Sequence, residues 1–158
     1  QLNSVVKPGD IVIVSIHWGA NWGYNIPENK KEFAHKLIDE AGVDIIHGHS
    51  SHHPKGIEIY HGKPVIYGAG DFINDYEGIS GYESFRDDLS LMYFVSMDIK
   101  TGKLTKFQMV PMQIKQLRLR FPQEEDVKWI SQVLDRESSK LGSKIETTPE
   151  GFILLNRD

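Results

Sequence analysis

Residues 10–16 read Asp-Ile-Val-Ile-Val-Ser-Ile, and residues 43–47 read Val-Asp-Ile-Ile-His. Both stretches are short and rich in β-branched side chains, and glycine lies nearby in the chain, which is typical of buried strands. Between them, residues 28–41 carry apolar side chains at helical spacing, and Gly42 ends that pattern. A strand, a helix and a strand in this order predict a right-handed parallel βαβ unit.

After this unit the pattern becomes that of antiparallel hairpins. Two hairpins are predicted, one with strands at 56–60 and 64–68 and one with strands at 89–99 and 103–112. A helix is predicted over residues 123–141, and two short strands around Gly151 close the chain. The acidic, glycine-punctuated segment 69–88 lacks a regular period, and we expect it to form a lid or rim beside the histidines. The predicted fold class is α/β, a βαβ unit followed by antiparallel hairpins.

The composition bounds the function. The 158 residues suit one domain, and a net charge of −4 excludes an electrostatic nucleic-acid binder. The absence of cysteine excludes disulfides and thiolate metal sites. No apolar run reaches the length of a membrane span. The basic stretch 115–120 alternates charged and apolar residues, which indicates a strand edge or, alternatively, an anion patch.

Histidines are the side chains most suited to chemistry here. The chain has seven, and four of them lie within residues 47–53. Neutral imidazole is a common ligand of zinc, manganese and iron. Because ligands gather at the strand ends of α/β sheets, we expect His17, His49 and His52 to hold a metal, with His49 and His52 on one loop. His47 is a further candidate for contact with the metal ligands or the substrate, and it is otherwise either a buried histidine bonded to the backbone or a ligand itself.

The remaining histidines have plainer interpretations. His53 follows His52 directly and is expected to point elsewhere, while His35 and His61 are expected to be solvated. Two further segments carry candidates for contacts with the metal ligands or the substrate. These are Trp18 and Asn21 in the aromatic loop after His17, and Asp71 and Asn74 in a Gly-Asp-x-x-Asn segment. The aromatic loop is expected to form a lid, a stacking wall or simply a packed loop.

Several motifs together resemble those of the CapA family. The segments that carry the resemblance are His17-Trp18-Gly19, Ala41-Gly42-Val43-Asp44, Gly48-His49-x-x-His52 and Tyr67-Gly68-x-Gly70-Asp71-Phe72. CapA-type proteins are linked to poly-γ-glutamate capsule synthesis and resemble calcineurin-like metallophosphoesterases. The resemblance implies a two-sheet sandwich flanked by helices. It also implies that His17 belongs to the fourth metallophosphoesterase motif and His49 and His52 to the fifth.

The chain departs from the family pattern in two respects. Two residues separate His49 from His52 where one is commoner, so either His47 or His49 is the partner of His52. The early motifs, which supply an aspartate, a bridging acid and an Asn-His pair, do not occur before His17. Residues 1–158 are therefore expected to be the C-terminal portion of a CapA-like domain, with about half of a site for two divalent metals (Mn, Zn or Fe).

The resemblance implies metal-dependent hydrolysis or transfer at a phosphoester, acyl-phosphate or γ-glutamyl linkage in the intact parent. We expect residues 1–158 alone to be inactive. The implied partners are an anionic polymer or phosphoester substrate and other capsule-assembly proteins, and the implied location is the cell envelope, although this chain shows no signal or anchor. A non-catalytic polymer-binding subunit is the alternative, and a stable half-domain without either role is the third.

Overall fold

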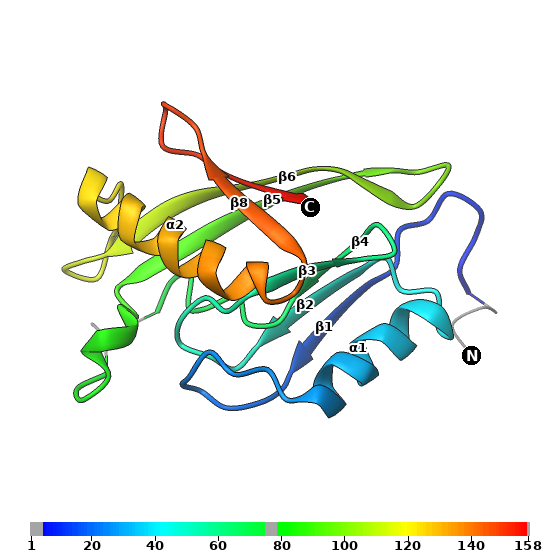
Figure 1. Ribbon diagram of the computed structural model, residues 1–158, viewed down its shortest axis with the longest axis horizontal. Helices are drawn as coiled ribbons and strands as arrows, with labels where there is room; N and C mark the ends of the chain where they lie inside the picture. Colours follow the sequence, from blue (N-terminus) through cyan, green and yellow to red (C-terminus); the bar gives the residue numbers. More distant parts are fainter. Residues whose placement is uncertain (1–4, 75–78, 158) are drawn as a thin grey trace.

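A computed structural model of the protein describes residues 5–74 and 79–157. Two β-sheets lie one above the other, with helix α1 (Glu28–Asp39) beneath the first and helix α2 (Glu124–Ser139) alongside the second (Figure 1). The predicted α/β class and the two-sheet sandwich flanked by helices are confirmed. No helix within the described residues is long and apolar enough to cross a bilayer.

The first sheet contains the predicted βαβ unit. Its strands are β1 (Ile13–His17), β2 (Ile45–His49), β3 (Ile57–Tyr60) and β4 (Lys63–Ile66), in the order β1-β2-β4-β3. β1 and β2 are parallel, as are β2 and β4, whereas β3 and β4 form an antiparallel hairpin. The predicted topology is confirmed, but β2 begins and ends two residues later than the 43–47 prediction. Its ladder with β1 carries it on to His49, so His49 closes a strand and does not share a loop with His52.

The second sheet is antiparallel and comes from the second half of the chain. Strands β5 (Leu89–Asp98) and β6 (Lys103–Ile114) form the predicted long hairpin, and β8 (Ser143–Thr147) and β9 (Ile153–Arg157) form the short one. A two-residue strand, β7 (Leu119–Arg120), pairs with the end of β6. The strand-edge interpretation of 115–120 is therefore confirmed for its last two residues, while the backbone turns at Gln116 and Leu117, both with positive φ.

Two apolar cores lie on opposite faces of the first sheet. Beneath it, α1 contributes Ala34 and Ile38 to a core with Ile46 and Val65. Above it, Ile57 and Ile66 pack with residues of the second sheet and α2. In a strand, alternate residues share a face. Since His47 pairs with Ile66 across the ladder, the side chains of His47 and His49 lie on the upper face, toward the second sheet.

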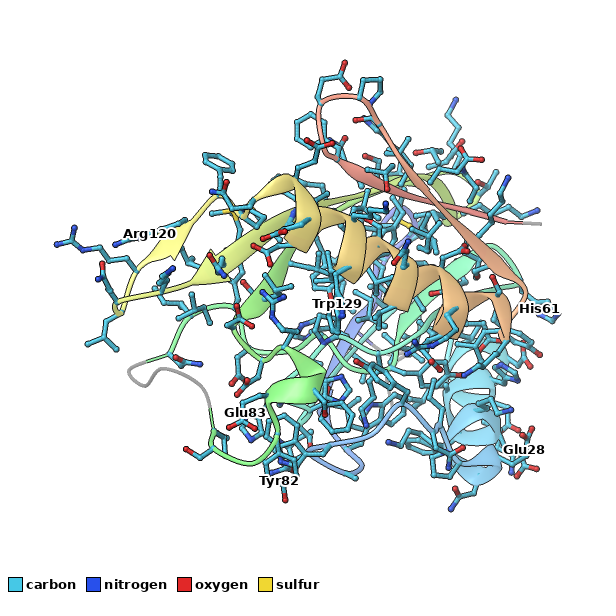
Figure 2. The ribbon with its side chains drawn as sticks, turned by 60° about the vertical axis from the view of Figure 1, so that its left-hand side comes forward. Glu28, His61, Tyr82, Glu83, Arg120 and Trp129 are labelled. Carbon is cyan, nitrogen blue, oxygen red and sulfur yellow. The ribbon has the colours of Figure 1, made fainter. Side chains whose placement is uncertain are left out.

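The described part of segment 69–88 ends in a short 3₁₀ helix, η2 (Glu83–Phe85). Residues 75–78 of the predicted lid lie outside the described residues. Tyr82 and Glu83, at the start of η2, lie at the end of the molecule opposite the C-terminal hairpin of β8 and β9 (Figure 2). The Tyr82 ring stacks on Trp22 at a centroid distance of 4.1 Å, which places residues 79–86 beside the loop that follows β1.

Candidate functional site

The parallel register of β1 and β2 brings two histidines together at the strand ends. His17 pairs directly with His49, and two residues earlier Ser15 pairs with His47. The rings of His17 and His49 are 5.2 Å apart at an interplanar angle of 71°. Two imidazoles that bind one ion at about 2.0–2.1 Å from nitrogen to metal have ring centres about 5 Å apart. The pair therefore has the spacing that a shared metal requires.

His47 lies beside this pair. Its ring is 5.8 Å from that of His49, and its Nδ1 is 3.1 Å from the Ser15 hydroxyl. Burial lowers the pKa of His47, and the charge that His49 can carry lowers it further. The neutral imidazole, which is the metal-binding form, is therefore favoured at this position.

His52 lies in the loop after β2 and has a different environment. Its Nδ1 is 2.9 Å from Asp71 Oδ2, and its ring packs against Trp22 at 5.2 Å. A carboxylate that accepts a proton from Nδ1 fixes the tautomer in which Nε2 carries the lone pair, as in many metal-binding histidines. Nε2 lies 3.4 Å from the amide nitrogen of Asn21.

Three of the predicted supporting residues are joined to His52 through polar contacts. The Asn74 amide donates to Asp71 Oδ2 at 3.3 Å, and the Asn21 side chain reaches both His52 and the Ser50 hydroxyl. Trp18, another of the predicted supporting residues, lies away from His52. Its indole N–H donates to the carbonyl of Tyr67, and the two rings stack in the core beneath the sheet.

The site has a partial fit to a metal. His17 and His49 are spaced for one ion, and His52 has a carboxylate on its far nitrogen. Across residues 5–74 and 79–157, however, no three His, Asp or Glu side chains are gathered closely enough to form a complete metal site. The described residues thus offer an incomplete set of ligands, and the roles of His17, His49 and His52 stay predictions.

The other histidines are structural in their contacts. His53 is fully buried against Phe85, Trp22 and Tyr24 and donates through Nδ1 to the carbonyl of Pro54. His61 is exposed, as predicted. The prediction of a solvated His35 is wrong, because Glu58 in β3 binds its Nε2 at 2.9 Å and the Tyr60 ring stacks on it at 3.7 Å.

Sequence reasoning missed two lysines that approach the loop after β1. Lys55 is 3% exposed, and its ammonium donates to the carbonyl of Ala20 at 3.0 Å. Lys30 in α1 lies over the Trp18 ring at 5.4 Å. Lysine is ordinarily solvated, so residue type alone gave no signal for Lys55.

Comparison with known proteins assigns the chain to a protein family. Residues 1–76 match the family described as bacterial capsule synthesis protein PGA_cap. The chain is 48% identical over 147 residues, 93% of its length, to a probable polyglutamine synthesis accessory protein of Mycobacterium tuberculosis. It is 30% identical over 114 residues, 72% of its length, to the PGA biosynthesis protein CapA of Bacillus subtilis. This chain belongs to the CapA family of capsule synthesis proteins.

The chain spans only part of these relatives. It covers 38% of the length of the mycobacterial protein and 28% of the Bacillus subtilis protein. A third relative, the capsule biosynthesis protein CapA of Bacillus anthracis, is 31% identical over 84 residues, which is 53% of this chain and 19% of that protein.

Proposed function

We propose that the complete CapA-type protein is a metal-dependent hydrolase of polyglutamate capsule synthesis, and that this chain supplies histidine ligands to its metal centre. The observation that carries the proposal is the in-register pairing of His17 with His49 at the ends of two parallel strands, with rings 5.2 Å apart. Neighbouring strand ends are the usual ligand-binding edge of a parallel sheet.

Each residue has a role in this proposal. His17 and His49 hold the ion, and His52 joins them through Nε2 while Asp71 holds its ring in the required tautomer. Asn74 keeps Asp71 in place through its side-chain amide. The Asn21 amide, which lies 3.4 Å from His52 Nε2, would release that nitrogen when the ion binds. A bound divalent ion would supply Lewis-acid activation of water and of the phosphoryl or acyl oxygen. The substrate class is a phosphoester, acyl-phosphate or γ-glutamyl linkage of the anionic polymer.

A second candidate is a polymer-handling subunit without catalysis. It is favoured by the absence of a complete ligand set among the described residues. The aromatic surface of Trp22 and Tyr82 beside His52 would then be part of a binding cleft, because stacked rings present a rigid contact area.

The two candidates are separated by metal analysis and turnover of the complete protein. We expect stoichiometric bound metal and measurable hydrolysis of an aryl phosphodiester. We also expect His49→Ala to lose metal and at least about 10²-fold in rate, since removing a ligand should exceed the loss on changing a residue behind it. His61→Ala is the matched control, because that imidazole is 66% exposed and bonded to Asp39. A metal-free, inactive wild-type protein that still binds polyglutamate would support the second candidate.

A further inference from the structure

The cations of this protein divide into two groups by their partners. Among the described side chains, five basic residues are buried or half-buried. Three of them, Lys31, Lys63 and Arg86, each contact a carboxylate. Within residues 5–74 and 79–157, neither Lys30 nor Lys55 has an acidic partner. A cation withdrawn from water without a counter-charge is costly, so these two lysines require an explanation.

Both lysines approach the same loop, from two different elements. Lys55 comes from the segment before β3 and donates to the carbonyl of Ala20, an exposed residue. Lys30 comes from α1, and its ammonium lies so close to Gly19 that a β-carbon there would overlap it. The buried stem of Lys55 thus delivers its charge to the exposed loop that directly follows His17.

The electrostatics of the pair match this geometry. Burial lowers the pKa of Lys30. Burial and, to a smaller extent, the nearby charge of Lys30 together lower the pKa of Lys55 to about 8. An ammonium group that opposes the ionisation of a neighbouring ammonium indicates a locally positive potential, in a protein whose net charge is −4. An anion between them would relieve both the burial cost and the repulsion.

A buried hydroxyl lies next to the stem of Lys55. Ser51 is 3% exposed, and its Oγ has no hydrogen-bond partner among the described residues. The side chains of Ser51 and Lys55 both pack against Gly68. A β-carbon at Gly68 would overlap the Ser51 hydroxyl and lie 2.8 Å from Lys55 Cγ. Of the three ammonium donors of Lys55, only the one to Ala20 is used within the described residues. The Ser51 hydroxyl and the Lys55 ammonium thus both carry donors that no described residue takes up.

We propose that Lys30 and Lys55 form an oxyanion-binding subsite beside the histidines, which takes a carboxylate or phosphate group of the substrate. The assignment of that group to a capsule polymer rests on the proposed function, whereas anion binding itself does not. Charge-assisted hydrogen bonds from two lysines favour a compact oxyanion over a neutral ligand. The subsite would place an anionic group within reach of the loop that follows His17.

The test is anion binding by the metal-free protein, measured by calorimetry in EDTA at low, constant ionic strength. The probes are inorganic phosphate and a γ-linked tri-glutamate, with chloride as the reference anion. We expect Lys30→Met and Lys55→Met each to weaken binding by about tenfold or more, since each removes a charge-assisted contact. Lys31→Met, which removes a charge one position away that is paired with Glu28, should change the affinity less than about twofold.

A second measurement covers the case in which Lys55→Met does not fold. In the wild-type protein, the bound anion should slow acetylation of the Lys55 amine but not of the exposed Lys36, as read by mass spectrometry. Binding of phosphate alone, of tri-glutamate alone or of both would identify the source of the oxyanion. Binding of neither, or equal weakening by all three lysine variants, would overturn the subsite. His49→Ala should retain anion binding, so failure of the metal proposal would leave this one standing.

Discussion

Replacement of Lys55 by methionine should make the protein more stable at pH 7. The side chain is 3% exposed, and burial, followed by the charge of Lys30, lowers its pKa from 10.5 to about 8. That difference corresponds to about 3 kcal/mol of destabilisation by the charged form. Lys55→Met also loses the hydrogen bond to Ala20, which reduces the stability gained by removing the charge by about 1 kcal/mol. The expected net gain for Lys55→Met is about 2 kcal/mol in the free energy of unfolding.

The same reasoning fixes the sign of the pH dependence. Because the pKa of Lys55 is lower in the folded state than in the unfolded state, the penalty is complete below pH 8 and disappears as the pH rises past 10.5. Between pH 7 and about pH 9.5, the wild-type protein should therefore gain about 2 kcal/mol relative to Lys55→Met.

Urea denaturation followed by circular dichroism, in EDTA and without phosphate, measures both quantities. Lys31→Met serves as the control, and its free energy of unfolding should stay within about 0.5 kcal/mol of the wild-type value, because its partner Glu28 is 72% exposed. A Lys55→Met protein that is less stable than wild type at pH 7, with no change in the pH dependence, would refute the reasoning. It would show that the ammonium is a structural link to the loop.

Three further predictions concern the scaffold and the histidines. Gly48→Ala should lower the free energy of unfolding by about 1–3 kcal/mol, because the new methyl group would overlap the indole nitrogen of Trp18. The melting temperature measured by calorimetry should fall accordingly, and an unchanged value would contradict this. Asp71→Asn in the complete protein should weaken Mn²⁺ binding by about 10–100-fold in a calorimetric titration, and equal affinity would separate Asp71 from the metal site. Burial lowers the pKa of His53 from 6.5 to about 4. The stability that this neutral imidazole contributes above pH 6.5 is therefore lost as the pH falls toward 4. Acidification from pH 7.5 to 5 should lower the free energy of unfolding by about 2 kcal/mol through His53. His53→Phe should abolish that part of the acid-induced loss, as measured by urea denaturation in EDTA.

The order of strands and helices could be predicted because the hydrophobic periodicity and the positions of the turn-forming residues indicate the same elements along this chain. The alternation of residues 89–112, for example, gives a hairpin whose strands are observed at Leu89–Asp98 and Lys103–Ile114. Strand ends were harder. β2 extends to His49 because its partner β1 reaches His17, and a ladder between distant segments leaves no local signature. The same long-range pairing decides that His49 is a strand residue rather than a loop residue.

The site was predictable where it depends on residue type and not where it depends on burial. Histidines at strand ends indicated the region where His17 and His49 meet. Asp71 was expected only near the site, and its contact with His52 is a finding of the structure. Lys55 could not be identified, because its position against the loop arises from the packing of Gly68 and the buried segment before β3. His35 was misassigned for a similar reason: Glu58, its partner, lies 23 residues away on another element.

One loop connects the candidate metal centre with the proposed anion subsite. The carbonyls of three successive residues, from Gly19 to Asn21, accept hydrogen bonds from Ser50, Lys55 and the backbone of His52. Residues after β2 therefore fix the loop that follows β1, and the parallel register that pairs His17 with His49 determines where both begin. A buried ammonium that has no acidic partner among the described residues, and that is expected to weaken the fold while it reaches this loop, is the pattern expected when stability is given up for binding. Variants that stabilise the protein through Lys55 should accordingly lose anion affinity, whereas variants that weaken the sheet should affect both sites together.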